Sequence, residues 1–268
     1  MMKKRRNIQN ESGYTIVELL IAIPLASIVL VVMMSALFSY YINVYAEAAR
    51  SNLRTSGQAL LINLQDELLF TIAYGEHLDV NLSDPYAPSG GWSYNSSPQT
   101  LIINEVALDS TRRDDDRHIV RRKVVSNCAS ASEASNPVAL NNIIYFVEDN
   151  PGSDYDSLVK RTVTPNYNLC GIDSVTKLPC TPTSSTCKAN AKTTTCPAAN
   201  VNTGVCKGAD STLTDKVKGF SIKYFSENNI ETSYPSDADK LEISLTLGDK
   251  IYGREVTVDV KHTIRKIN

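Results

Sequence analysis

The sequence has little net charge, few histidines and none of the common catalytic motifs. Lysine and arginine nearly balance aspartate and glutamate, leaving a formal net charge of −2, and the chain has 3 histidines. A near-neutral balance argues against wholesale electrostatic capture of nucleic acid. No P-loop, GxSxG or HExxH motif occurs, so no nucleotide site, serine nucleophile or catalytic zinc is indicated. We therefore expect no enzymatic activity, no catalytic residue, no metal site and no cofactor.

Charge is entirely missing from one long stretch near the N-terminus. No charged residue occurs between Glu18 and Glu47, and residues 19–38 are strongly apolar. Twenty helical residues span about 30 Å, which matches the hydrocarbon core of a bilayer. Four positive charges precede this stretch, namely Lys3, Lys4, Arg5 and Arg6. The positive-inside rule then predicts a single transmembrane helix with a cytoplasmic N-terminus and an exported remainder.

One carboxylate, that of Glu18, stands where the apolar stretch begins. A charge drawn into the bilayer costs about 2.5–3.5 kcal/mol on insertion scales, so Glu18 needs either a partner or a position at the cytoplasmic interface. The segment GYTIVELL at residues 13–20 resembles the processing motif of type IV prepilins, with the basic leader, glycine, glutamate and apolar run in matching order. The resemblance implies that prepilin peptidase cuts between Gly13 and Tyr14, that Tyr14 is then N-methylated, and that Glu18 serves filament assembly.

Two residues depart from the usual prepilin pattern. Tyr14 replaces the commoner phenylalanine, which keeps an aromatic side chain, and Pro24 removes one helical hydrogen bond and should kink or loosen the helix. Cleavage would expose an amine at Tyr14. That amine can pair with Glu18 of a neighbouring subunit inside an apolar bundle, because two charges that are costly to bury alone become tolerable together.

The apolar pattern divides the chain into a leader, a membrane segment and an exported domain. We expect a leader at residues 1–13, a transmembrane and filament-core segment at 14–44, and an exported domain at 45–268. An amphipathic helix is expected over residues 45–72, continuous with the membrane segment. Its apolar stripe recurs at helical spacing and consists of Leu53, Leu60, Leu61, Leu64, Leu68 and Ile72.

The rest of the exported domain has the pattern of an antiparallel sheet, expected within residues 100–268. Strands are predicted at 100–108, 119–125, 142–148 and 158–164, and the last third alternates apolar and polar residues with a period of two. A turn is predicted at Gly248-Asp249-Lys250, and Trp92 and Tyr94 are expected to pack a long loop onto the domain. The fold class is therefore α+β, with a long helix packed on an antiparallel sheet.

This order of elements is similar to that of one pilin subgroup, the PilW-type minor pilins and the J-type pseudopilins of type II secretion. The features that carry the likeness are the large exported domain, a strand containing Tyr145, the segment 158–161 and the terminal segment 263–266.

Five of the six cysteines are concentrated between Cys170 and Cys206, in a segment that has little to bury. The six are Cys128, Cys170, Cys180, Cys187, Cys196 and Cys206. None forms a C-x-x-C motif, so zinc clusters and thioredoxin-type chemistry are poorly supported. An exported domain permits disulfides, and an insertion at 165–210 needs them as staples, with fifteen pairings open. The stapled loop could also serve as an adhesive or partner-binding surface.

Two charged clusters allow other functions. A basic cluster could contact DNA through phosphates, although three aspartates interrupt it. Its members are Arg112, Arg113, Arg117, Arg121, Arg122 and Lys123, with Asp114, Asp115 and Asp116 between them. Asp149, Asp154 and Asp156 could bind calcium, but the EF-hand spacing is absent. A solvated surface is the commoner meaning of such clusters.

The resemblance implies a structural subunit, a minor pilin or pseudopilin, of a type IV pilus-like filament. Its implied partners are prepilin peptidase, other pilins, lipid before assembly, and an inner-membrane platform powered by a separate ATPase. The implied location is the inner membrane, followed by a filament at the cell surface or in the periplasm. The alternative is a single-span surface adhesin or receptor that stays anchored in the membrane.

Overall fold

The computed structural model describes most of the exported domain and the apolar helix. The described residues are 15–68, 71–78, 83–107, 119–124, 128, 136–164, 168–173, 175–176, 178–181, 186–188 and 193–265. The basic leader and the expected cleavage site at Gly13 and Tyr14 lie outside these ranges.

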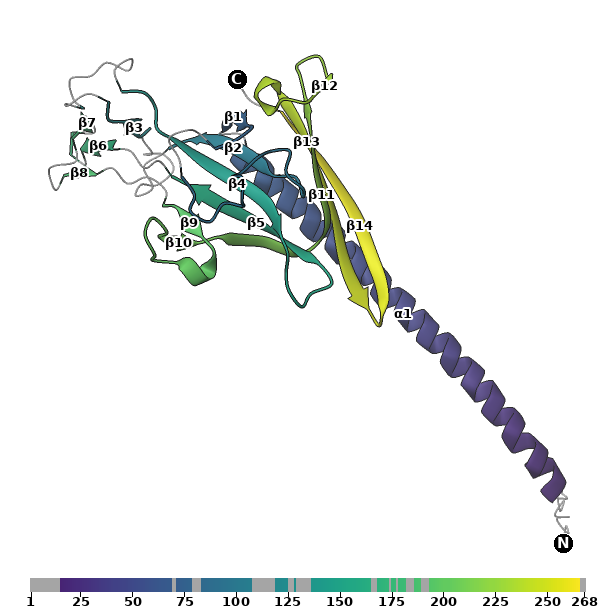
Figure 1. Cartoon of the computed structure of the whole chain (residues 1–268). Coiled ribbons are helices and arrows are strands. Elements are labelled where there is room, and N and C mark those ends of the chain that lie inside the picture. The colour runs from purple at the N-terminus through teal and green to yellow at the C-terminus, as the bar shows by residue number, and fades with distance from the viewer. Residues whose placement is uncertain are drawn as a thin grey trace, which may run out of the picture.

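A single long helix runs from a curled antiparallel sheet and projects beyond it as a stalk (Figure 1). Helix α1 spans Ile16–Leu68, 53 residues, and continues through Pro24. The sheet has the order β1-β2-β4-β5-β11-β13-β14, with β12 paired to β11. Its strands are β1 (Thr71–Gly75), β2 (Leu101–Val106), β4 (Leu140–Glu148), β5 (Asp156–Val163), β11 (Ser211–Phe225), β12 (Glu231–Thr232), β13 (Lys240–Ile251) and β14 (Arg254–Arg265). The expected α+β class, a long helix with an antiparallel sheet, is confirmed.

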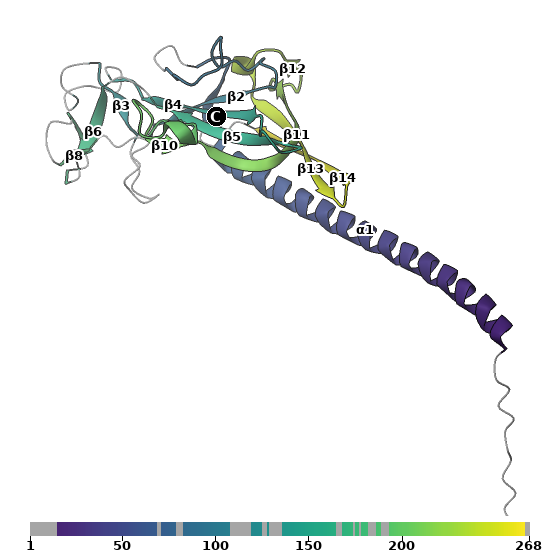
Figure 2. The same cartoon turned by 60° about the horizontal axis from the view of Figure 1, so that its bottom comes forward.

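Strand β11 is long enough to join two halves of the sheet. Its first part pairs with β5 and its second part with β13, and the register shifts between Val217 and Gly219. Figure 2 shows the curved sheet lying over one side of the C-terminal half of α1, which we call its outer half. This curl gives the helix a concave apolar face to pack against.

The outer half of α1 buries one apolar stripe. Its buried residues are Ala46, Ala49, Leu53, Gly57, Leu61, Leu64 and Leu68. The predicted leucine stripe is therefore confirmed through Leu68, with Leu60 partly buried against the same core. The expected extension of the helix to residue 72 is wrong, because Ile72 belongs to strand β1 and is 43% exposed. The sheet accordingly begins before residue 100.

Gly57 brings the helix close to the sheet. A Cβ atom there would lie 2.9 Å from both Leu247 Cδ1 and Val260 Cγ2. Glycine weakens a helix by about 1 kcal/mol relative to alanine. The close approach to β13 and β14 is the packing reason for tolerating that cost.

The predicted turn at Gly248-Asp249-Lys250 is wrong. These residues lie inside β13, and the turn is formed by Tyr252 and Gly253, whose φ angles are +48° and +81°. Two consecutive positive φ angles are typical of a type I′ hairpin. Gly248 instead makes room for an aromatic ring, because a Cβ there would lie 2.3 Å from Tyr155 Cε1.

The other predicted strands differ from the observed ones mainly in the residues at which they begin and end. Of the strand predicted at 119–125, the described residues 119–124 contain only the short strand β3 (Arg121–Arg122), which pairs with β6 rather than with the main sheet. The loop containing Trp92 packs on the far face of the sheet as expected, where Trp92 is 5% exposed and lies with Ile144 and Phe146.

The cysteine-rich insertion consists of short strands tied by disulfides. The strands are β6 (Leu169–Asp173), β7 (Pro179–Cys180), β8 (Cys187–Lys188), β9 (Thr195–Cys196) and β10 (Gly208–Ala209). All six cysteines are paired, as Cys128–Cys170, Cys180–Cys187 and Cys196–Cys206. The predicted disulfide staples are confirmed, and the structure selects one of the pairings that the spacing left open.

Candidate membrane and assembly segment

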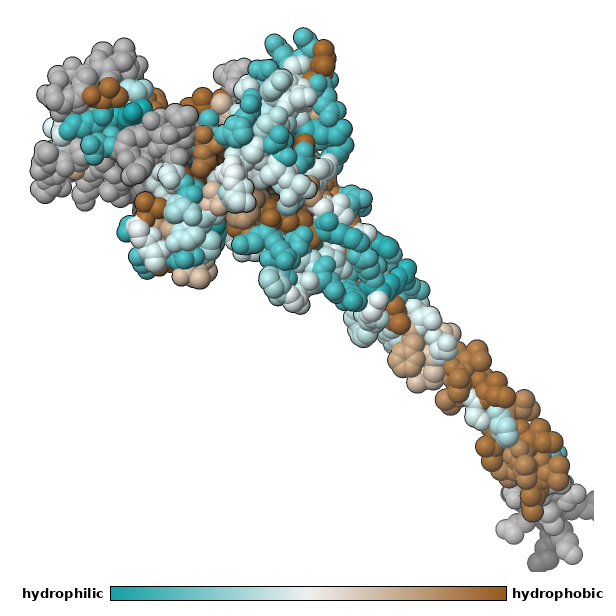
Figure 3. Space-filling model, in the orientation of Figure 1, coloured by the Kyte–Doolittle hydropathy of each residue, from teal (hydrophilic) through white to brown (hydrophobic). Residues whose placement is uncertain are grey.

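The inner half of α1 is apolar and uncovered. From Ile16 to Tyr45 its residues are exposed, except for the half-buried Ile42, and the first buried residue is Ala46. Figure 3 shows this half as an apolar stalk extending from a more polar domain. The helix is long and apolar enough to cross a membrane. The isolated domain offers this surface no cover, so water is a poor environment for it.

Glu18 closes a capping box at the start of the helix. Its carboxylate Oε2 accepts hydrogen bonds from the Thr15 backbone nitrogen at 2.9 Å and from Thr15 Oγ1 at 3.0 Å. In return, the Glu18 backbone nitrogen donates to Thr15 Oγ1 at 3.3 Å. The T-x-x-E spacing at residues 15–18 is the sequence signal for this arrangement. Glu18 therefore has a local structural role in addition to the expected assembly role, which remains a prediction.

The hairpin of β13 and β14 follows the helix down to the edge of the apolar stalk. Near its tip, Arg254 Nη1 donates to Asn43 Oδ1 at 2.8 Å, and the Tyr252 and Tyr45 rings meet edge-on with centroids 5.9 Å apart. Farther up, His262 Nε2 lies 2.6 Å from Gln65 Oε1. Contacts at both ends hold the hairpin parallel to α1.

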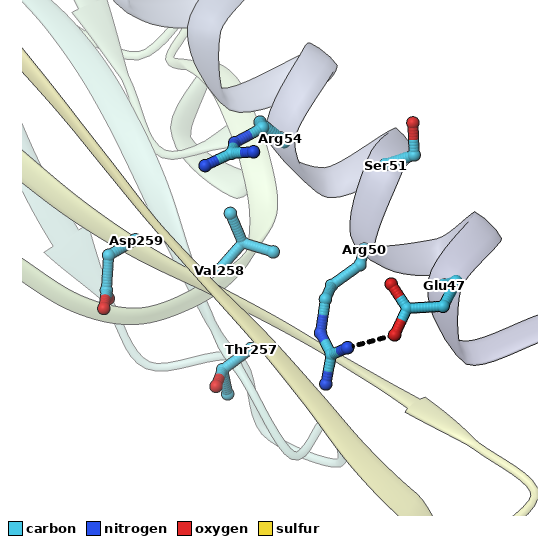
Figure 4. A pocket seen from close by; sticks show the side chains of 7 residues that line it. All are labelled: Glu47, Arg50, Ser51, Arg54, Thr257, Val258 and Asp259. Atoms are coloured by element: carbon cyan, nitrogen blue, oxygen red, sulfur yellow. Dashed lines mark hydrogen bonds and ion pairs between the residues drawn. The ribbon is translucent and has the colours of Figure 1, made fainter. Parts of the chain in front are cut away.

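A charged groove lies beside this hairpin, just beyond the stalk. It is lined by α1 and β14 through Glu47, Arg50, Ser51, Arg54, Thr257, Val258 and Asp259. Figure 4 shows the Arg50 guanidinium turned toward the Glu47 carboxylate, with which it forms an ion pair. Both side chains are substantially exposed, so this pair contributes little to stability.

A buried ion cluster, which the sequence analysis missed, holds three distant segments together. The Arg161 guanidinium from β5 contacts Asp84 Oδ2 at 3.0 Å and Asp210 Oδ2 at 2.6 Å. The side chains of Arg161, Asp84 and Asp210 are 3%, 0% and 9% exposed. Arg161 also donates to the Tyr86 carbonyl oxygen at 3.0 Å. It thereby fixes the loop before β2 and the segment after β10 onto the sheet.

Aromatic rings complete the surroundings of this cluster. The Arg161 Cζ atom lies 5.4 Å from the Trp92 ring centroid and 5.3 Å from that of Phe146. Trp92 Nε1 donates to Asp84 Oδ2 at 2.7 Å. Burial opposes the charge on Arg161, but hydrogen bonds to Asp210 and Asp84 raise its pKa above the ordinary value. Arg161 therefore stays charged in the core, with a structural role.

A second polar contact joins the end of the helix to the sheet. Tyr145 Oη donates to the Glu67 carboxylate, and Lys160 Nζ lies 2.5 Å from the same carboxylate. Burial raises the pKa of the Tyr145 hydroxyl well above its usual range, and the Glu67 charge adds to the effect. The hydroxyl is thus a hydrogen-bond donor at physiological pH.

The remaining charged clusters do not form a metal centre in the described part of the chain. Among these residues, no group of three or more histidine, cysteine, aspartate or glutamate side chains could hold a metal ion. Asp154, one of the calcium candidates, pairs with Lys250 at 3.0 Å. In the basic cluster, Arg121 and Arg122 lie in β3, whereas residues 108–118 lie outside the described ranges.

No protein-family model matches this sequence, and no curated protein or solved structure is significantly similar to it.

Proposed function

We propose that this chain is a structural subunit, a minor pilin or pseudopilin, of a type IV pilus-like filament. The observation that carries the proposal is the single helix α1, whose uncovered apolar half begins at Glu18 and passes directly into a half packed on its own sheet. A membrane stores such a half before assembly, and a bundle of equivalent helices covers it afterwards. The precursor is cleaved between Gly13 and Tyr14, and Tyr14 is N-methylated.

In this proposal the N-terminus lies in the cytoplasm and the domain beyond residue 45 is exported across the inner membrane. The three disulfides fit an oxidising compartment, because such bonds persist there. Extraction into a filament at the cell surface or in the periplasm requires other pilins and a platform driven by a separate ATPase.

The first test is the N-terminal mass of the protein from cells with and without prepilin peptidase. We expect a chain beginning at methylated Tyr14, seen only with the peptidase. A chain that still carries Lys3 to Arg6 in cells with active peptidase would overturn the proposal and favour a permanently anchored adhesin or receptor.

Two variants of Glu18 separate assembly from helix capping. Glutamine retains the side-chain acceptor of the capping box but carries no charge, whereas alanine removes both. If Glu18 pairs with a neighbour's amine, Glu18→Gln and Glu18→Ala are both cleaved normally and both fail to enter filaments. Normal incorporation of Glu18→Gln, measured in sheared filament fractions, would reduce Glu18 to a capping residue.

A further inference from the structure

Four tyrosines gather where the domain meets the apolar stalk. Tyr40, Tyr41 and Tyr45 project from α1, and Tyr252 forms the tip of the β13–β14 hairpin. Their exposed fractions are 65%, 56%, 52% and 75%. They are linked as two edge-on pairs, Tyr40 with Tyr41 and Tyr45 with Tyr252. Tyrosine is enriched at membrane interfaces, because its ring is apolar and its hydroxyl is polar.

Tyr252 is an unusual residue for its position. Both turn residues have positive φ, where asparagine, aspartate or glycine is normally found and a larger side chain is disfavoured. Its ring is mostly exposed, and its ring contact within the chain is with the exposed Tyr45. The contact with Tyr45 helps to hold the tip on α1 but leaves most of the Tyr252 ring uncovered, so the folded domain accounts for only part of its apolar surface.

The distances along the helix place the backbone of this group at the outer edge of the headgroup layer, within reach of that layer for side chains that lean toward the bilayer. If the hydrocarbon core ends near Phe38, then Asn43 and Tyr45 lie about 7.5 and about 10.5 Å farther along the axis. Helical side chains lean toward the N-terminus, which brings the Tyr45 ring back toward the bilayer. The headgroup layer is about 5–7 Å thick on each side. Tyr252 shares this level because its ring contacts Tyr45.

The charged residues around the hairpin tip are compatible with a position in the lipid headgroup layer. The Arg254 guanidinium is held at this level by Asn43, and lipid phosphates are good acceptors for it. The acidic residues on either side of the turn, Asp249 and Glu255, are each paired with a lysine of β11. These pairs are Asp249 with Lys216 and Glu255 with Lys218, each at 2.5 Å. Both carboxylates that flank the turn are therefore compensated, which reduces their repulsion from anionic lipid.

We infer that the β13–β14 hairpin tip, with Tyr252 and Arg254, inserts into the outer headgroup layer and forms a second membrane contact beside α1. The inference rests on the proposed anchoring of the helix. Two contacts fix the tilt and rotation of the domain over the membrane before assembly, whereas a single helix leaves rotation free. Leaving the membrane then requires release of the hairpin tip as well as extraction of the helix.

The experiment uses tryptophan variants of the full-length chain in phosphatidylethanolamine–phosphatidylglycerol vesicles whose acyl chains are brominated near the carbonyl. The chain has 1 tryptophan, the buried Trp92, whose signal is measured in the unmodified protein and subtracted. Tyr252→Trp reports the hairpin tip and Phe38→Trp reports the anchor. Tyr234→Trp is the matched control, because Tyr234 is also an exposed tyrosine, 58% accessible, and lies beyond the opposite end of β13.

We expect the signal of Tyr252→Trp to shift to the blue and lose most of its intensity in brominated vesicles, as the Phe38→Trp signal does, while Tyr234→Trp is unchanged. Quenching of Phe38→Trp without quenching of Tyr252→Trp would overturn the hairpin contact and leave the anchor standing. Equal quenching at positions 234 and 252 would also overturn it, because the domain would then adsorb without orientation. Absence of quenching at position 38 would overturn the anchor and the hairpin contact together.

Discussion

Replacing Arg161 by methionine should strongly destabilise the exported domain. Methionine retains much of the length of the side chain but leaves two carboxylates, Asp84 and Asp210, buried without a cation. Removing one partner from a buried ion pair typically costs about 3–5 kcal/mol. For a domain of this size, that loss lowers the midpoint of thermal unfolding by roughly 6–20 °C. The change is a large part of the stability of about 5–15 kcal/mol that is typical of domains.

The assay is thermal or urea unfolding of the full-length protein in detergent, followed by Trp92 fluorescence. Trp92 is suited to this purpose because it is the single tryptophan and lies against the Arg161 guanidinium. The matched variant Asp84→Asn/Arg161→Met/Asp210→Asn removes all three charges and should recover most of the lost stability, because no ion is left unpaired. A loss below about 1 kcal/mol for Arg161→Met alone would refute the reasoning, since exposed pairs contribute no more than that.

Two further predictions concern packing and cross-linking, both measured by the same unfolding assay. Gly57→Leu should lower the free energy of unfolding by about 1–3 kcal/mol despite better helix propensity, because its side chain collides with Leu247 and Val260. The control Ser51→Leu, at an exposed position of the same helix, should be nearly neutral. Equal effects of the two substitutions would contradict the close approach of the helix to the sheet at Gly57. Removing the Cys128–Cys170 bridge, whose sequence separation is 42, should lower the free energy of unfolding by about 4 kcal/mol on the chain-entropy model. Removing Cys180–Cys187, whose separation is 7, should lower it by about 2.5 kcal/mol. A larger loss for the shorter loop would contradict the chain-entropy account.

Much of the architecture was predictable because its signals are local. The leucine stripe through Leu68 and the period-two strands near the C-terminus follow from the geometry of a single helix or strand. The errors fell where a local signal had two meanings. Gly248 resembled a turn glycine, but it lies within a strand and admits the ring of Tyr155. Ile72 continued the helical spacing, but its segment pairs with β2 instead.

The candidate assembly segment could also be predicted from the sequence, because its signals lie close together in the chain. Glu18, its spacing from Gly13 and the uncharged run that follows are adjacent in the chain, so they could be recognised together. The structure adds the reciprocal hydrogen bonds between Glu18 and Thr15, for which the T-x-x-E spacing at residues 15–18 is the sequence signature.

The sequence by itself determined the apolar stalk, the helix–sheet class and the need for disulfides in the insertion. Only the tertiary structure decided which cysteines pair, which carboxylates meet Arg161, and that the hairpin tip comes to lie beside the helix. Periodicity and composition report how each segment buries its own surface, whereas the Cys128–Cys170 bridge and the Arg254–Asn43 hydrogen bond join residues 42 and 211 positions apart. Such long-range partners are set by how the strands, the insertion and the helix are arranged in three dimensions.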